Sequence, residues 1–152
     1  MQYHTQLIRH DPDKGIAGDC FRTVLACLLD LEPDGVLHFM GDLKEDLSVS
    51  WAKVDEWLGA EYGLRFVMIR LQVPKIDQWL EYMERENPGL RMELGGQSPR
   101  GTCHSVVAQG GKVIHDPHPD GGGVVGPCDD GCYSLGFLVP TKIHGSRPGT
   151  TG

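Results

Sequence analysis

The apolar stretch from Cys20 to Leu31 constrains the fold more than any other segment. Its apolar residues recur at the three- and four-residue spacing of a helix that buries one face. Asp19 stands at the N-cap position, and Pro33 ends the pattern. The sequence therefore predicts a central helix here. The residues of its predicted apolar face are Val24, Leu25, Leu28 and Leu29.

The remaining segments predict more helices before Pro88 and mainly strands after it. A short strand is expected at residues 5–9, a helix at 51–63 capped by Ser50, a strand at 64–71 and a helix that begins at Pro74. After Pro88, short β-like segments separated by Gly or Pro turns predict an antiparallel sheet. The expected fold class is α/β, more narrowly α+β, with the N-terminal helices packed on a C-terminal antiparallel sheet. The four later strands are expected at residues 90–94, 103–109, 112–116 and 133–140.

Length and charge narrow the classes of protein. The 152 residues fit one domain, expected at residues 1–143, followed by a flexible tail at residues 144–152. The formal net charge of -7 would repel nucleic acid and anionic membranes, so neither is an expected partner. No apolar run reaches signal-peptide or membrane-spanning length, which favours a soluble, cytoplasmic protein. Five cysteines without a secretory signal are expected to be thiols.

Cys20 is the candidate nucleophile because it begins the predicted central helix. The helix dipole lowers the pKa of a thiol at this position, and the free backbone N–H groups there can hold an oxyanion. Cys27 lies two turns further along and is expected to be inert packing. The alternative for Cys20 is the same, since cysteine is among the most frequently buried residue types.

His104 and Asp116 are the candidate base and the residue that orients it. If Gly110 and Gly111 form a two-residue turn, Ser105 falls opposite Asp116 and His104 points to the other face. A three-residue loop places His104 opposite Asp116 instead, so a catalytic pair requires that register or a bulge. The alternative is a strand histidine with a satisfied hydrogen bond, followed by an ordinary surface turn.

The order of these residues resembles the papain-like cysteine peptidase superfamily. In particular, "GDC" before an apolar helix and the later "HSVVAQGGKVIHDP" look like the bacteriocin leader peptidases. The chain is also similar to small uncharacterised bacteriophage proteins that carry a Gly-Asn/Asp-Cys helix and an "HDPHP" turn. The resemblance implies a helix packed on an antiparallel sheet, a catalytic set of Cys20, His104 and Asp116, and no metal.

One position departs from the papain-like pattern. The glutamine that usually completes the oxyanion hole stands about six residues before the nucleophile, and that position here is Lys14. The oxyanion candidates are therefore the backbone N–H of Cys20 together with Asp19 and Gln97. Of these, Gln97 is suggested only by its proximity to His104 in the sequence.

The expected activity is cysteine-dependent hydrolysis or acyl transfer at an amide, isopeptide or thioester carbonyl, without a cofactor and with a peptide or protein substrate. One alternative is a non-catalytic papain-like protein that holds a host factor in its cleft. A metal-dependent hydrolase is the other, although its ligand spacings match no usual zinc motif. Its candidate ligands are Cys103, His104, His115, Asp116 and His118, with "CDDGC" at residues 128–132 nearby.

Overall fold

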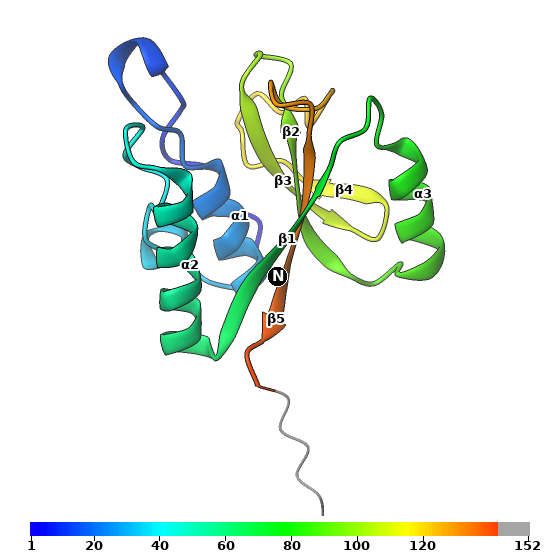
Figure 1. Ribbon diagram of the computed structural model, residues 1–152, viewed down its shortest axis with the longest axis horizontal. Helices are drawn as coiled ribbons and strands as arrows, with labels where there is room; N and C mark the ends of the chain where they lie inside the picture. Colours follow the sequence, from blue (N-terminus) through cyan, green and yellow to red (C-terminus); the bar gives the residue numbers. More distant parts are fainter. Residues whose placement is uncertain (143–152) are drawn as a thin grey trace, which may run out of the picture.

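The computed structural model describes residues 1–142 as three layers, helix on sheet on helix (Figure 1). Helices α1 and α2 lie on one side of the sheet and α3 lies on the other. The tail expected at residues 144–152 falls outside the described residues. The elements are α1 (Cys20–Leu29), α2 (Leu47–Tyr62), β1 (Leu64–Leu71), α3 (Asp77–Glu86), β2 (Arg91–Gln97), β3 (Cys103–Gln109), β4 (Lys112–His115) and β5 (Tyr133–Pro140), with single 3₁₀ turns at Pro12–Lys14 and Pro33–Gly35.

The sheet is antiparallel, with strand order β1-β5-β2-β3-β4. Strand β1, from the first half of the chain, pairs with β5 at the end of the second half. Helix α1 packs on β3, and α2 packs on β1. The predicted α+β class and the antiparallel sheet are confirmed.

Helix α1 forms as predicted, but its N-cap differs from the expectation. Asp19 makes no side-chain cap; its carboxylate accepts hydrogen bonds from the backbone N–H of Leu7 (3.3 Å) and Ile8 (2.8 Å) and pairs with Arg22 (2.9 Å). The strand expected at residues 5–9 does not form, and the carboxylate of Asp19 holds this segment instead. Asp19 therefore ties the N-terminal segment to the start of α1.

The other two helices begin at different residues from those predicted. Helix α2 begins at Leu47 because Asp46 is its cap, accepting a hydrogen bond of 2.8 Å from the N–H of Ser48. Ser50, the expected cap, is buried inside the helix. Gly63 ends α2 in the left-handed conformation, as predicted. Helix α3 begins at Asp77 rather than at Pro74.

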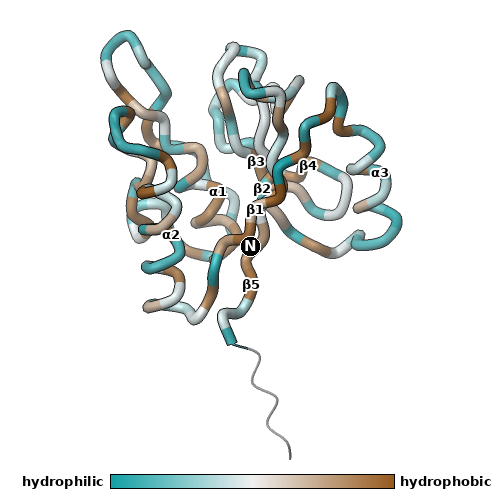
Figure 2. Tube along the Cα trace, viewed as in Figure 1, coloured by the Kyte–Doolittle hydropathy of each residue, from teal (hydrophilic) through white to brown (hydrophobic). Residues whose placement is uncertain are grey.

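Apolar side chains fill both faces of the sheet. Figure 2 shows the hydrophobic residues gathered along α1 and the central strands, while the projecting loop near residues 10–16 is hydrophilic. Among residues 1–142, no helix has the length and hydrophobicity needed to cross a lipid bilayer. The core on the α1 and α2 side includes Phe21, Leu25, Val54, Leu58 and Phe66; the core on the α3 side includes Met83, Met92, Leu94, Val106 and Leu135.

The hairpin of β3 and β4 combines two features that the sequence left as alternatives. Its turn has two residues, because Gln109 pairs with Lys112. A bulge then shifts the register by one, so that Val107 pairs with His115. The extra residue reverses which face later β4 residues point to. Continued by one residue, this register puts Asp116 on the same face of the hairpin as His104.

Shortening a buried side chain in the middle of α1 should destabilise the whole fold. Leu25 is completely buried among α1, α2 and the sheet. We expect Leu25→Ala to lower the free energy of unfolding by about 2–5 kcal/mol, measured by urea denaturation, because the lost contacts leave a cavity. Leu7→Ala is the matched control, since Leu7 is 66% exposed. Equal effects of the two substitutions would contradict the assigned core.

Candidate active site

A cleft of about 480 Å³ contains both Cys20 and His104 in its walls. The start of α1 forms one side of the cleft, and the first residues of β3 form another. Glu93 and Gly95 of β2 also line it, as does Trp51 of α2. The fold therefore brings together two of the three predicted catalytic residues, with Asp116 behind one of them.

Cys20 is the first residue of α1 and is partly exposed. Burial of the thiol raises its pKa to about 11. Hydrogen bonds from the backbone of Ser105 and Phe21 act in the opposite direction, whereas the nearby carboxylates of Glu93 and Asp19 add to the rise. The expectation that the helix N-terminus lowers this pKa is therefore wrong, because burial and the nearby carboxylates outweigh the backbone hydrogen bonds.

His104 and Asp116 form the predicted pair. Nε2–H of the imidazole donates to Oδ1 of Asp116 at 2.7 Å, so Nδ1 is the basic nitrogen of the neutral ring. Backbone N–H groups of His118 and Gly123 also donate to the two carboxylate oxygens, each at 2.8 Å. The loop after β4 thus fixes the carboxylate, which fixes the tautomer of His104.

The environment of this pair shifts both pKa values downward. Burial lowers the pKa of His104, and the neighbouring Asp116 only partly offsets this effect. Burial acts to raise the pKa of Asp116, but hydrogen bonds from His104 and from the two backbone N–H groups outweigh it and hold the pKa below its usual value. The resting pair is therefore an aspartate beside a neutral imidazole.

The side chains of Cys20 and His104 lie on different faces of strand β3. Side chains alternate along a strand, so Ser105 and Val107 point toward α1, whereas His104 shares the opposite face with Val106. Within residues 1–142 no hydrogen bond joins the Cys20 sulfur to the His104 ring. The sulfur instead contacts the backbone of Ser105, the residue that follows His104. Cys20 and His104 therefore open to one cleft without touching.

The oxyanion candidates differ in whether their donors are free. The backbone N–H of Asp19 already donates to the Ile8 carbonyl at 3.2 Å. The side-chain amide of Gln97 donates to the Gly101 carbonyl at 3.3 Å, and its backbone N–H donates to Gly126. The N–H of Cys20, at the first position of α1, is the remaining candidate.

Glu93 is a site residue that the sequence prediction missed. It lies in the central strand β2, is only 2% exposed, and accepts hydrogen bonds from Ser105 Oγ (2.8 Å) and Ser134 Oγ (3.3 Å). Burial raises its pKa to about 7. A signal was available, because Glu93 is a carboxylate that stands between the apolar residues Met92 and Leu94 of the expected strand.

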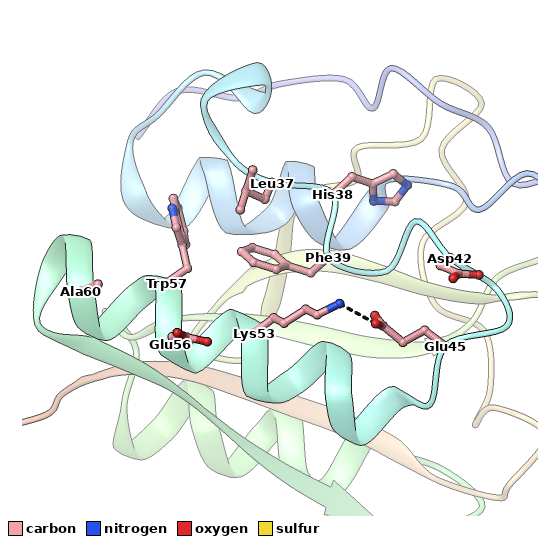
Figure 3. A pocket seen from close by; sticks show the side chains of 9 residues that line it. All are labelled: Leu37, His38, Phe39, Asp42, Glu45, Lys53, Glu56, Trp57 and Ala60. Atoms are coloured by element: carbon pink, nitrogen blue, oxygen red, sulfur yellow. Dashed lines mark hydrogen bonds and ion pairs between the residues drawn. The ribbon is translucent and has the colours of Figure 1, made fainter.

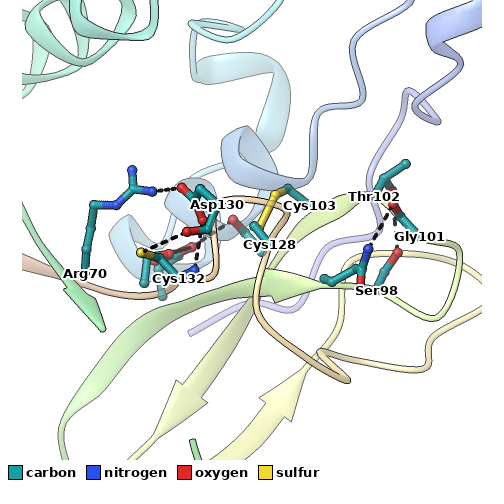
Figure 4. The surroundings of a disulfide bond; sticks show 12 residues. Arg70, Ser98, Gly101, Thr102, Cys103, Cys128, Asp130 and Cys132 are labelled. Atoms are coloured by element: carbon teal, nitrogen blue, oxygen red, sulfur yellow. Dashed lines mark hydrogen bonds and ion pairs between the residues drawn. A yellow bond between two sulfur atoms is a disulfide. The ribbon is translucent and has the colours of Figure 1, made fainter. Parts of the chain in front are cut away.

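Two of the cysteines expected to be thiols are joined. A disulfide links Cys103, next to His104, to Cys128 (Figure 4). Cys132 is a free thiol across a tight turn in which the N–H of Cys128 donates to the Cys132 carbonyl at 3.0 Å. The disulfide connects the first residue of β3 to the loop before β5. Cys27 is fully buried against Val107 and is packing, as predicted.

Among residues 1–142, neither a metal-binding group nor a second cavity coincides with the positions of Cys20, His104 and Asp116. In the described part of the chain, no three His, Cys, Asp or Glu side chains gather as a metal-binding group. A second cavity, of about 580 Å³, lies between α2 and the segment that precedes it and contains none of the predicted catalytic residues (Figure 3). The smaller cleft is therefore the candidate active site.

Removing the carboxylate of Asp116 should lower the pKa of His104. Asp116 acts to raise that pKa against the effect of burial, so Asp116→Asn leaves burial unopposed. We expect an NMR titration of the imidazole to give a lower pKa in the variant than in the wild type. Asp120→Asn is a control within the same loop. An unchanged His104 pKa in Asp116→Asn would contradict the assigned pair.

Replacing Glu93 should change how stability depends on pH. Its pKa is raised from 4.5 to about 7, so the folded protein binds this proton more tightly than the unfolded chain does. The free energy of unfolding should fall as the pH rises between these values and level off above them. Glu93→Gln lacks the titrating group and should be more stable than the wild type above that window, by on the order of 3 kcal/mol.

Urea denaturation at about pH 5 and about pH 8 measures this difference. Glu45→Gln is the control, because the pKa of Glu45 is lowered by its hydrogen bond to Lys53 rather than raised. A stability difference between Glu93→Gln and the wild type that does not change with pH would contradict the assigned burial of an ionisable carboxyl group.

Comparison with known proteins provides no relative for this chain. No protein-family model, curated protein or solved structure matches it.

Proposed function

We propose that the protein is a cysteine-dependent hydrolase or acyl transferase with a papain-like mechanism. Cys20 is the nucleophile, His104 the general base and then acid, and Asp116 the residue that orients the imidazole. The observation that carries this proposal is the 2.7 Å hydrogen bond from His104 to Asp116 beside a cleft that Cys20 also lines. An α1 helix that begins at this cysteine and packs on an antiparallel sheet is the arrangement that a papain-like enzyme requires.

The proposed reaction proceeds through an acyl-enzyme. The sulfur of Cys20 attacks the substrate carbonyl as its proton passes to Nδ1 of His104. The tetrahedral intermediate, held by the N–H of Cys20, collapses when the leaving group departs with the proton from His104. Water or a second acceptor, deprotonated by His104, then attacks the thioester and releases Cys20. Hydrolysis and transfer differ only in that acceptor.

The resting geometry requires one rearrangement. A thiol whose pKa is about 11 is protonated at neutral pH, so attack needs a base in contact with the sulfur. Within residues 1–142 His104 makes no hydrogen bond to Cys20, so the proposed mechanism requires substrate binding to bring the two side chains into contact. Catalytic hydrogen bonds often tighten only when substrate is bound. A peptide or protein segment that fills the cleft would displace water and is the proposed substrate.

A non-catalytic binding protein is the second candidate. The raised pKa of the Cys20 thiol and the engaged donors of Asp19 and Gln97 favour it. In this case the cleft would hold a host factor without covalent chemistry. A metal-dependent hydrolase has no comparable support, because no donor set gathers in the part of the chain that the structure describes.

Acylation by an activated ester distinguishes the first two candidates. With p-nitrophenyl acetate near pH 7, we expect an acetyl group on Cys20, mapped by peptide mass spectrometry, and none at this position in Cys20→Ala. His104→Ala should slow acylation by about 100-fold or more, because the general base is lost. His115→Ala is the matched control, since His115 lies on β4 and does not line the cleft.

Two results would count against the enzyme. Equal acylation rates in wild type and His104→Ala would remove the base from the mechanism. Absence of both acetyl-Cys20 and Cys20-dependent release of p-nitrophenolate in correctly folded wild type would favour the binding protein.

A further inference from the structure

The strongest feature outside the proposed catalytic set is the carboxylate of Glu93 in the wall of the cleft. Within residues 1–142 it has no cationic partner; both of its oxygens accept hydrogen bonds only from hydroxyl groups. A buried carboxylate without a counter-charge is costly to ionise, and a bound cation reduces that cost. The fold therefore retains an uncompensated acid where a ligand can reach it.

The surroundings of Glu93 form a polar cradle that depends on a glycine. Gly95, Ser105 and Ser134 line the cleft together with Glu93. A Cβ on Gly95 would stand 2.6 Å from Oε1 of Glu93 and 2.1 Å from Oγ of Ser134. Only a residue without a side chain allows the carboxylate and the hydroxyls to converge here. The cradle is thus built into three neighbouring strands, β2, β3 and β5.

A single residue, Ser105, connects this polar cradle to the nucleophile Cys20. The hydroxyl of Ser105 donates to Glu93, while the backbone of the same residue hydrogen-bonds to the sulfur of Cys20. Glu93 and Cys20 also point to the same face of the sheet, since Glu93 alternates with the β2 residues that face α3. A group bound to Glu93 would therefore lie beside the reacting sulfur.

The other charges of the cleft favour a cation. Arg70 of the lining is already paired with Asp130, and Glu45 is paired with Lys53. These two pairs are neutral overall, so Asp42 and Glu93 carry the remaining charge of the described lining, and an excess of negative charge concentrates cationic ligands. Among the described residues of the lining, the acids are Asp42, Glu45, Glu93 and Asp130, and Arg70 is the only lysine or arginine.

We propose that Glu93 is a specificity-determining residue that binds an ammonium or guanidinium group of the substrate beside Cys20. This inference rests on the proposed function, because it names the class of substrate that would be acylated or cleaved there: one with a basic side chain or amine near the reacting carbonyl. A bound cation would also oppose the effect of Glu93 on the thiol, whose pKa the carboxylate helps to raise. Binding of the correct substrate and activation of the sulfur would then be coupled.

Thiol-reactive probes of opposite charge test the inference. The probes are 2-aminoethyl methanethiosulfonate, a cation, and 2-sulfonatoethyl methanethiosulfonate, an anion. Each forms a mixed disulfide with Cys20 and releases methanesulfinate. The measured quantity is the ratio of the cation rate to the anion rate at Cys20, by peptide mapping, divided by the same ratio for a free cysteine peptide. We expect this normalised ratio to be about tenfold or more in the wild type, the effect of one favourable charge interaction.

Variants assign the preference to Glu93. Glu93→Gln should bring the normalised ratio close to one, whereas Glu93→Asp, which keeps the charge, should retain a preference for the cation. Glu45→Gln is the matched control, because Glu45 lines the same cleft but is paired with Lys53. If Glu93→Gln does not fold, the wild-type ratio remains decisive, since a normalised ratio near one overturns the inference by itself. An unchanged ratio in folded Glu93→Gln also overturns it.

This experiment and the acylation experiment test the two proposals independently. Thiosulfonate exchange at Cys20 needs neither an acyl-enzyme nor His104. A cation preference that depends on Glu93, in a protein that is never acylated, would overturn the proposed function and leave a cation-binding cleft. Acylation that depends on His104, without a charge preference, would overturn the role of Glu93 and leave the enzyme.

Discussion

The packing of α1 on the sheet is the constraint on which the rest of the structure depends. Its fully buried side chains fix the helix against β3, and this fixes where the helix begins. Cys20 lies at that first residue, so its sulfur meets the backbone of Ser105. The ties from Asp19 to Leu7 and Ile8 close the same end of the helix from the other side. The position of the candidate nucleophile thus follows from apolar burial a full turn or more away.

Most of the fold could be predicted from local patterns, because the helices and strands each have a clear hydrophobic period and clear turn residues. The helix at Cys20 and the strand at residues 64–71 are examples. Helix starts were less predictable, since Asp46 and Ser50 have equal capping chemistry and tertiary packing buries the second. The order of strands, with β1 beside β5, depends on long-range pairing that no local pattern encodes.

The candidate site was also predictable only in part, because some of its contacts depend on residues that are distant in the sequence. The contact of His104 with Asp116 needed a bulge, and sequence could name that condition without deciding it. The pKa of Cys20 was predicted in the wrong direction, because its burial and the carboxylate of Glu93 come from segments distant in sequence. The Cys103–Cys128 disulfide joins residues 25 apart and likewise reflects a spatial neighbourhood rather than a motif.

The bulge in the hairpin has a consequence for how this chain can vary in length. Val107 pairs with His115 because one residue of β4, Ile114, is left over after Val113 pairs with Ala108. Any change that adds or removes a single residue between there and Asp116 would send the carboxylate to the opposite face and separate it from His104. Insertions of two residues would preserve the facing side. Relatives that keep the contact between His104 and Asp116 should therefore differ in this segment by even numbers of residues. Loops outside the hairpin can change in length by any number of residues.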